Sequence, residues 1–156
     1  HQQRLERIAH YDTLTGLPNR VLLADRLRQA MAQARRRKQQ VAVAFIDLDG
    51  FKTINDTHGH ETGDQFLREV GLRMRRSLRE WDTVSRLGGD EFVAVMIDLP
   101  DRTALKRLLQ RLVEVLNTPI QIGDQLLPLS ASLGVSFYPQ SEELDAEQLL
   151  RQADQA

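Results

Sequence analysis

The side chains best suited to chemistry in this sequence are two small groups of carboxylates. Asp47 and Asp49 end a run of β-forming residues, and Asp90 and Glu91 follow a pair of glycines. Carboxylate oxygens without histidine or cysteine partners suit Mg²⁺, which usually completes its shell with water and substrate phosphates. The two groups together predict a magnesium site for a nucleoside triphosphate. Any one of these acids alone would more often be a solvated turn residue.

A polar segment, residues 50–64, lies between the two acidic groups and is predicted to be a loop. Its polar side chains are Lys52, Asn55, Asp56, His58, His60 and Asp64. The N1–H and amino groups of guanine donate to a carboxylate, and its O6 and N3 accept from an amide. Asn55 and Asp64 are therefore candidates for reading guanine. Asp64 could equally complement a helix dipole, and the two histidines could be ordinary loop residues.

Hydrophobic periodicity predicts the elements that must position these groups. Helices are expected at residues 20–37, 62–79, 101–116 and 144–156, and strands at 41–48, 83–87, 91–97 and 130–137. Gly88 and Gly89 fall between two strands, where a tight hairpin needs positive φ, so Asp90 and Glu91 are expected at a hairpin tip. This order predicts an α+β fold, with a mostly antiparallel central sheet built on a βαββαβ core and flanked by helices.

The composition narrows the class of protein. The 156 residues are 41% hydrophobic and 28% charged, which suits one soluble domain, and the net charge of −1 argues against a nucleic-acid partner. There is no cysteine for a disulfide or a thiolate metal site. No apolar run approaches the ~18–20 residues that span a bilayer. We expect a cytoplasmic domain, associated with a membrane only through other domains of a longer protein.

Four ordered motifs carry a resemblance to a known family. Residues 86–92 read Arg-Leu-Gly-Gly-Asp-Glu-Phe and contain the signature of GGDEF domains, the diguanylate cyclases. Residues 12–20 resemble the opening motif of that family, residues 47–64 its metal and guanine segment, and Ala153-Asp154 the start of its closing helix motif. The resemblance covers nearly the whole chain and implies a ferredoxin-like core of the nucleotidyl-cyclase or palm type.

The activity that this resemblance implies is the condensation of two GTP molecules into cyclic di-GMP. One GTP would sit on each subunit of a homodimer, and each 3′-hydroxyl would attack the α-phosphorus of the other GTP and release pyrophosphate. The implied cofactor is Mg²⁺, with Mn²⁺ as a substitute.

The resemblance also assigns residues to roles. The implied metal ligands are Asp47, the Leu48 carbonyl, Asp90 and Glu91, and the implied catalytic residues are Asp90, Glu91 and Lys52. The residues implied to bind GTP are Gly50, Phe51, Lys52, Asn55, Asp64, Gly88 and Gly89. Of these, Asn55 and Asp64 would read guanine, and Glu91 would bind metal or activate the 3′-hydroxyl.

The sequence Arg79-Glu-Trp-Asp82 resembles the inhibitory RxxD site that many members carry just before the signature. In those members the arginine holds phosphate and guanine of the product, and the acid reads guanine. A helix-terminal arginine followed by a turn aspartate would have the same sequence. Product inhibition is therefore an expectation that comes from the resemblance.

The resemblance also suggests boundaries. Residues 1–10, with Leu5 and Ile8 among polar residues, are expected to end a helix from an upstream signalling segment, and residues 11–156 to form the GGDEF domain. The family's closing motif continues with a tyrosine and basic residues that contact phosphates, whereas this sequence stops at Ala156. We therefore expect the domain to be truncated at its C-terminal end.

Two other functions are compatible with the predicted fold. The first is a non-catalytic module that senses GTP or cyclic di-GMP inside a larger regulator. Asp47, Asn55, Asp64, Asp90 and Glu91 are all present, which favours the enzyme. The second is an RNA-binding domain on a similar core, but the sequence lacks the exposed aromatic strand motif on which such domains stack bases.

Overall fold

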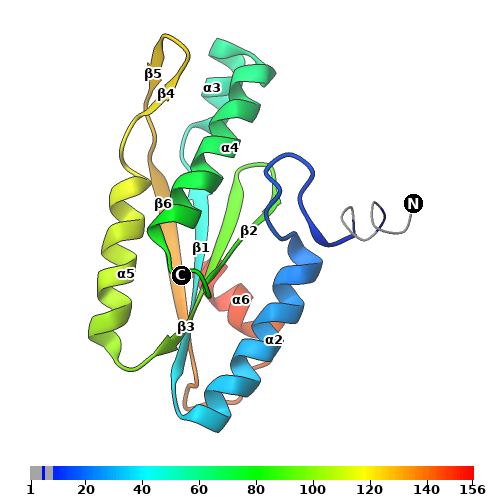
Figure 1. The fold of residues 1–156 in the computed structure, drawn as a ribbon, viewed down its shortest axis with the longest axis vertical. Helices are drawn as coiled ribbons and strands as arrows, with labels where there is room; N and C mark the ends of the chain where they lie inside the picture. Colours follow the sequence, from blue (N-terminus) through cyan, green and yellow to red (C-terminus); the bar gives the residue numbers. More distant parts are fainter. Residues whose placement is uncertain (1–4, 6–8) are drawn as a thin grey trace.

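The computed structural model describes Leu5 and residues 9–156, which form an antiparallel sheet with helices on both faces (Figure 1). The helices are α2 (Arg20–Arg37), α3 (Phe51–His58), α4 (His60–Ser77), α5 (Arg102–Val115) and α6 (Ala146–Gln155). The strands are β1 (Gln40–Leu48), β2 (Thr83–Gly88), β3 (Glu91–Leu99), β4 (Ile120–Ile122), β5 (Gln125–Leu127) and β6 (Ala131–Tyr138). Of the two apolar residues expected in an incoming helix, Leu5 is exposed and Ile8 lies outside the described residues.

The main sheet has four strands in the order β2-β3-β1-β6, and every neighbouring pair is antiparallel. The α3–α4 pair connects β1 to β2, and α5 leads from β3 toward β6, so the predicted βαββαβ core is confirmed. A separate two-stranded hairpin, β4–β5, was not predicted; it precedes β6 and contacts α4.

Successive side chains of β1 point to opposite faces of the sheet, and this divides the core into two layers. Ala42, Ala44 and Ile46 belong to the cluster that includes buried residues of α4 and α5. Val43 and Phe45 belong to the cluster that includes buried residues of α2 and α6. Both clusters are apolar because a central strand in a sheet covered on both faces must bury side chains in both directions. Odd-numbered residues of β1 therefore face α2 and α6.

The predicted glycine hairpin is confirmed, with Gly88 and Gly89 at φ values of 149° and 48°. Residues 50–64, predicted to be a loop, are instead α3 and the first part of α4, separated by Gly59. This prediction was wrong because α3 buries only Ile54, so its sequence shows no apolar stripe.

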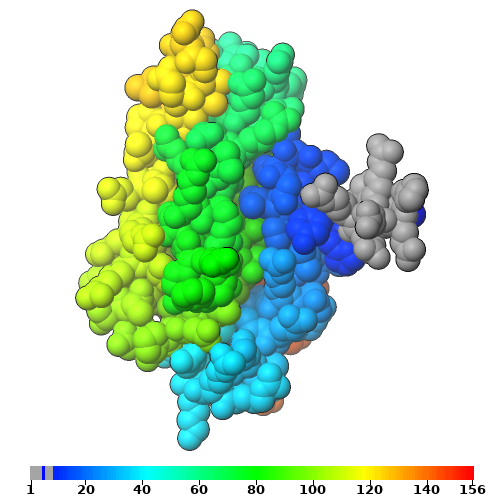
Figure 2. Space-filling view, viewed as in Figure 1, coloured from blue at the N-terminus to red at the C-terminus, as the bar shows by residue number. Residues whose placement is uncertain are grey.

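The surface in Figure 2 shows α4 between α5 and the segment that leads into α2. Among the described residues, none of the helices combines the length and the apolar character needed to cross a membrane.

Candidate active site

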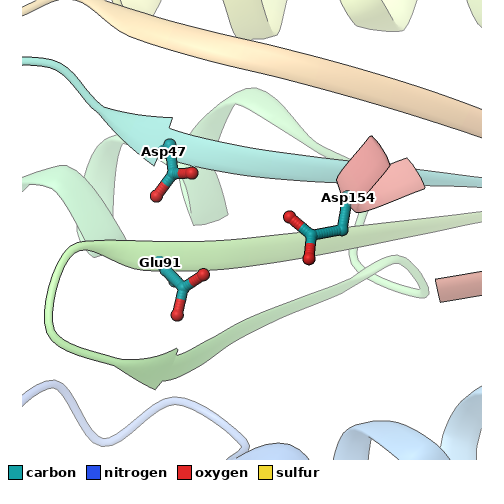
Figure 3. A group of neighbouring side chains, drawn as sticks. All are labelled: Asp47, Glu91 and Asp154. Carbon is teal, nitrogen blue, oxygen red and sulfur yellow. The ribbon is translucent and has the colours of Figure 1, made fainter. Parts of the chain in front are cut away.

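Two of the predicted metal ligands face each other across the two inner strands of the sheet. Asp47, near the end of β1, lies opposite Glu91, the first residue of β3, in the antiparallel register. Asp154 of α6 joins them, and one carboxylate oxygen from each of the three residues lies within 4.8 Å of the other two. Figure 3 shows these side chains gathered over β1 and β3. Such a set of hard oxygen donors fits Mg²⁺ or Mn²⁺.

The other predicted ligands, Asp90 and Leu48, lie beside this group. The backbone N–H of Leu48 donates to the Asp90 carbonyl over 3.2 Å, which ties the hairpin tip to the end of β1. Within the described residues, the Asp90 side chain is not part of the three-carboxylate group, but its charge acts on both Asp47 and Glu91. The sequence places Asp154 only in the closing helix motif of the family, and its position beside Asp47 and Glu91 was not predicted.

The crowding of acids raises the pKa of two of them. Burial is the main cause of the raised pKa of Asp47, and the charges of Asp90 and Asp154 add to it. Burial also contributes most to the raised pKa of Glu91, where the charge of Asp47 adds to it and that of Arg20 opposes it. A bound divalent cation would supply the positive charge that this group needs.

These raised pKa values predict how the stability of the metal-free protein depends on pH. The folded state should bind more protons than the unfolded state above the ordinary carboxyl pKa values of 3.8 for Asp47 and 4.5 for Glu91. The free energy of unfolding should therefore fall as pH rises through this window, and Glu91→Gln should reduce the decrease. Thermal melts of the wild type and Glu91→Gln between about pH 4 and 7, with a chelator present, measure this loss of stability. An equal pH dependence of the two proteins would contradict the raised pKa of Glu91.

Asp49 is held by different partners from the other acids of this region. Its carboxylate oxygens accept hydrogen bonds from the hydroxyls of Ser130 at 3.1 Å and Ser132 at 2.9 Å. Its backbone N–H donates to the Ser130 carbonyl at 2.9 Å. These contacts join the end of β1 to the start of β6, and they fix the chain just before the turn that begins α3.

The residues predicted to meet phosphate lie together at the start of α3. Gly50 is the N-cap in the left-handed conformation, with φ of 72°, and no side chain caps the helix. The first-turn N–H groups, beginning with Phe51 and Lys52, therefore point outward without a side-chain acceptor, as in helix ends that bind anions. The Lys52 side chain is exposed and can add a positive charge.

The predicted guanine-binding residues come from two consecutive helices. Gly63 of α4 makes their approach possible, because a Cβ atom there would lie 1.8 Å from the Asn55 Oδ1 atom. The Asn55 carboxamide of α3 thus packs on the α4 backbone beside Asp64, which is exposed. The contact at Gly63 therefore brings Asn55 of α3 next to the residue that precedes Asp64 in α4.

An ion pair connects the signature hairpin to the turn that precedes α2. The Arg86 Nη1 atom lies 2.9 Å from the Asp12 Oδ1 atom, and the two side chains are only 12% and 15% exposed. Arg86 also donates to the Gly89 carbonyl from Nε and Nη2, at 3.0 and 2.8 Å, and its backbone N–H donates to the Pro18 carbonyl. One arginine therefore holds the glycine turn and the opening motif together.

The two residues of the predicted inhibitory site bind each other. Arg79 donates from Nε and Nη2 to the Asp82 carboxylate, at 3.0 and 2.9 Å, and the Asp82 side chain is fully buried. The same carboxylate accepts from the backbone N–H groups of Arg79 and Ile97. The exposed ring of Trp81 lies under the Arg79 guanidinium, beside a groove of about 350 Å³ between this turn and α2.

A family model and similar curated proteins point to the same family. The model of the GGDEF diguanylate cyclase domain matches residues 9–156. The chain is 46% identical over 137 residues to the bifunctional diguanylate cyclase/cyclic di-GMP phosphodiesterase MucR of Pseudomonas aeruginosa, covering 88% of this chain and 20% of MucR. It is 40% identical to the diguanylate cyclase TpbB of the same organism, covering 95% of this chain and 34% of TpbB.

Solved structures show the same fold. The GGDEF domain of TpbB superposes with a TM-score of 0.84 at 39% identity, covering 91% of this chain and 88% of that one. The GGDEF domain of DgcB from Caulobacter crescentus, in complex with c-di-GMP, gives a TM-score of 0.80 at 30% identity, covering 95% and 87%. The chain spans between a fifth and a third of the length of the two curated relatives, so it corresponds to one part of each.

Proposed function

Because the chain belongs to the GGDEF family of diguanylate cyclase domains, we propose that it condenses two GTP molecules into cyclic di-GMP. The 3′-oxygen of each GTP forms a bond to the α-phosphorus of the other, and the bond from that phosphorus to the β-phosphate oxygen breaks. Two pyrophosphates leave, and each 3′-hydroxyl gives its proton to a base, for which Glu91 is the proposed acceptor. The observation that carries this proposal is the meeting of Asp47 and Glu91 beside the hairpin tip.

The residues of this chain would hold and orient the substrate. Asp47, Asp90, Glu91 and the Leu48 carbonyl are the proposed ligands of Mg²⁺ or Mn²⁺, which when bound neutralises phosphate charge and lowers the pKa of a bound hydroxyl. Gly88 and Gly89 leave room for the phosphates beside the hairpin. The first turn of α3, from Gly50 to Lys52, would accept the outer phosphates on its N–H groups.

Guanine selection by Asn55 and Asp64 gives a direct prediction. Asp64→Asn places a donor where the N1–H and amino groups of guanine need an acceptor, so the affinity for GTP should fall by about ten- to hundredfold. Asp56→Asn, which removes an exposed acid of neighbouring α3, is the matched control and should leave the affinity nearly unchanged. Calorimetric titration with GTP and with ATP measures the affinities of the wild type and of the two variants. Wild-type protein that binds ATP as tightly as GTP would disprove the assignment of Asn55 and Asp64 to guanine.

The reaction needs two domains face to face, because each protomer is proposed to present one GTP. The test is incubation with GTP and Mg²⁺, followed by chromatography for cyclic di-GMP and an assay for pyrophosphate. The rate per subunit should rise with protein concentration and with a fused dimeric coiled coil. GTP binding without either product would instead favour the non-catalytic sensor.

Regulation by product is proposed at Arg79 and Asp82. The GGDEF domain of DgcB has been crystallised in complex with c-di-GMP, so a domain of this family can hold the product. Trp81 and Asp82 line the groove, and Arg79 lies over the Trp81 ring, so a ligand with phosphates and guanine bases could enter beside this pair. For the Asp82 carboxylate to read guanine, Arg79 would have to release it.

A further inference from the structure

Asp154 occupies a position that none of the proposed roles explains. It lies in the last turn of α6, more than fifty residues after the nearest of the proposed metal ligands, and it meets Asp47 and Glu91 within 4.8 Å. We propose that Asp154 is a third carboxylate ligand of the divalent cation bound by Asp47 and Glu91. This inference rests on the proposed function and assigns a ligand to the same site.

The packing of α6 on the sheet places Asp154 with little freedom. A Cβ atom at Gly134 of β6 would lie 1.9 Å from the Ala153 carbonyl oxygen, so the helix backbone touches the strand at the residue before Asp154. The Ser136 hydroxyl donates to the Leu149 carbonyl at 2.8 Å and fixes the preceding turn of the helix. These contacts fix the backbone of α6 next to Asp154, and the side chain lies over β1 and β3 (Figure 3).

The charge of Arg20 offsets part of the negative charge of this group, since it lowers the pKa of Glu91. Three carboxylates gathered this closely repel one another, and in the described part of the chain no ion pair reaches any of them within 4.0 Å. Arg20 and Arg151 line an adjoining cavity of about 250 Å³ but make no such pair. The cavity, which has Phe45 in its wall, gives a hydrated cation access to Glu91 and Asp154. A divalent cation bound there would balance the charge of the three carboxylates.

The test is a titration of Mn²⁺ into the whole chain, with free Mn²⁺ measured by electron paramagnetic resonance and no nucleotide present. Asp154→Asn should lower the affinity for Mn²⁺ at least about tenfold, because one of three anionic ligands is lost. Asp124→Asn is the charge-matched control, because it removes an exposed acid of the turn between β4 and β5, outside the proposed site. It should change the affinity by less than about twofold.

Asp154 is exposed, so its substitution should leave the melting temperature close to that of the wild type. Asp154→Asn protein that binds Mn²⁺ as tightly as the wild type would overturn the inference, as would wild-type protein that takes up no Mn²⁺. Asp47→Asn separates the two proposals. If Asp47→Asn loses Mn²⁺ and Asp154→Asn does not, the role of Asp154 fails alone; if neither does, the proposed metal site fails as well.

Discussion

Glu91→Gln is expected to reduce the formation of cyclic di-GMP by roughly a thousandfold or more while the fold is retained. The amide has the shape of the carboxylate but lacks its charge, and it can neither hold Mg²⁺ well nor accept the proton of the 3′-hydroxyl. The substitution leaves the backbone pairing of Glu91 in the sheet intact, and because Glu91 lies opposite Asp47, loss of its charge relieves repulsion in the metal-free protein.

The measurement is the initial rate of product formation at saturating GTP and Mg²⁺, paired with a thermal melt. Glu114→Gln, an exposed acid of α5 outside the proposed site, is the matched control and should keep the wild-type rate. The informative combination is an inactive Glu91→Gln protein that melts no lower than the wild type. A rate within about tenfold of wild type would remove Glu91 from the proposed chemistry.

Arg79→Ala is expected to weaken the fold as well as product binding, which follows from the burial of Asp82. The substitution leaves a fully buried carboxylate without its cation and should lower the free energy of unfolding by about 3 kcal/mol. Arg79→Lys keeps a positive charge near Asp82 but loses the bidentate hydrogen bonding of the guanidinium. It should retain most of the stability and still bind cyclic di-GMP at least about tenfold more weakly.

Denaturant titration and calorimetry with cyclic di-GMP separate these two effects. Arg79→Ala combined with Asp82→Asn is the control for the stability effect, because the unpaired charge is gone and part of the lost free energy should return. If Arg79→Lys binds product as the wild type does, or if the wild type binds none, Arg79 and Asp82 are a structural pair and not an inhibitory site.

The fold could be predicted where apolar side chains repeat at regular spacing. The helix predicted at residues 20–37 matches α2, whose buried residues recur at helical spacing: Leu23, Leu27, Ala30, Met31 and Ala34. The glycine pair predicted a hairpin, which places Glu91 at the start of β3. These features are local, because helix and strand periods and the turn chemistry of glycine are determined by neighbouring residues.

Contacts between distant residues could not be predicted in the same way. Asp82 in a turn sequence suggests an exposed acid, yet Arg79 and the Ile97 backbone bury and satisfy it. The predicted helix over residues 62–79 includes Gly63, but nothing in the sequence shows that this small residue lets Asn55 pack on α4. The available signal for Asp154 was its place directly after buried Ala153 on an amphipathic helix, next to the face that meets the sheet.

The place of β1 in the middle of the sheet also has a consequence for how the chain folds. Its two partner strands, β3 and β6, begin more than forty and more than eighty residues after it, so neither edge of β1 can pair through a local turn. The β2–β3 hairpin, in contrast, is closed by a two-residue turn and can form early. During synthesis, the edge of β1 that pairs with β6 stays without a partner strand until β6 has been synthesised. Asp47 and Glu91 can therefore meet before α6 is synthesised, whereas Asp154 can reach them only when α6 packs on the sheet.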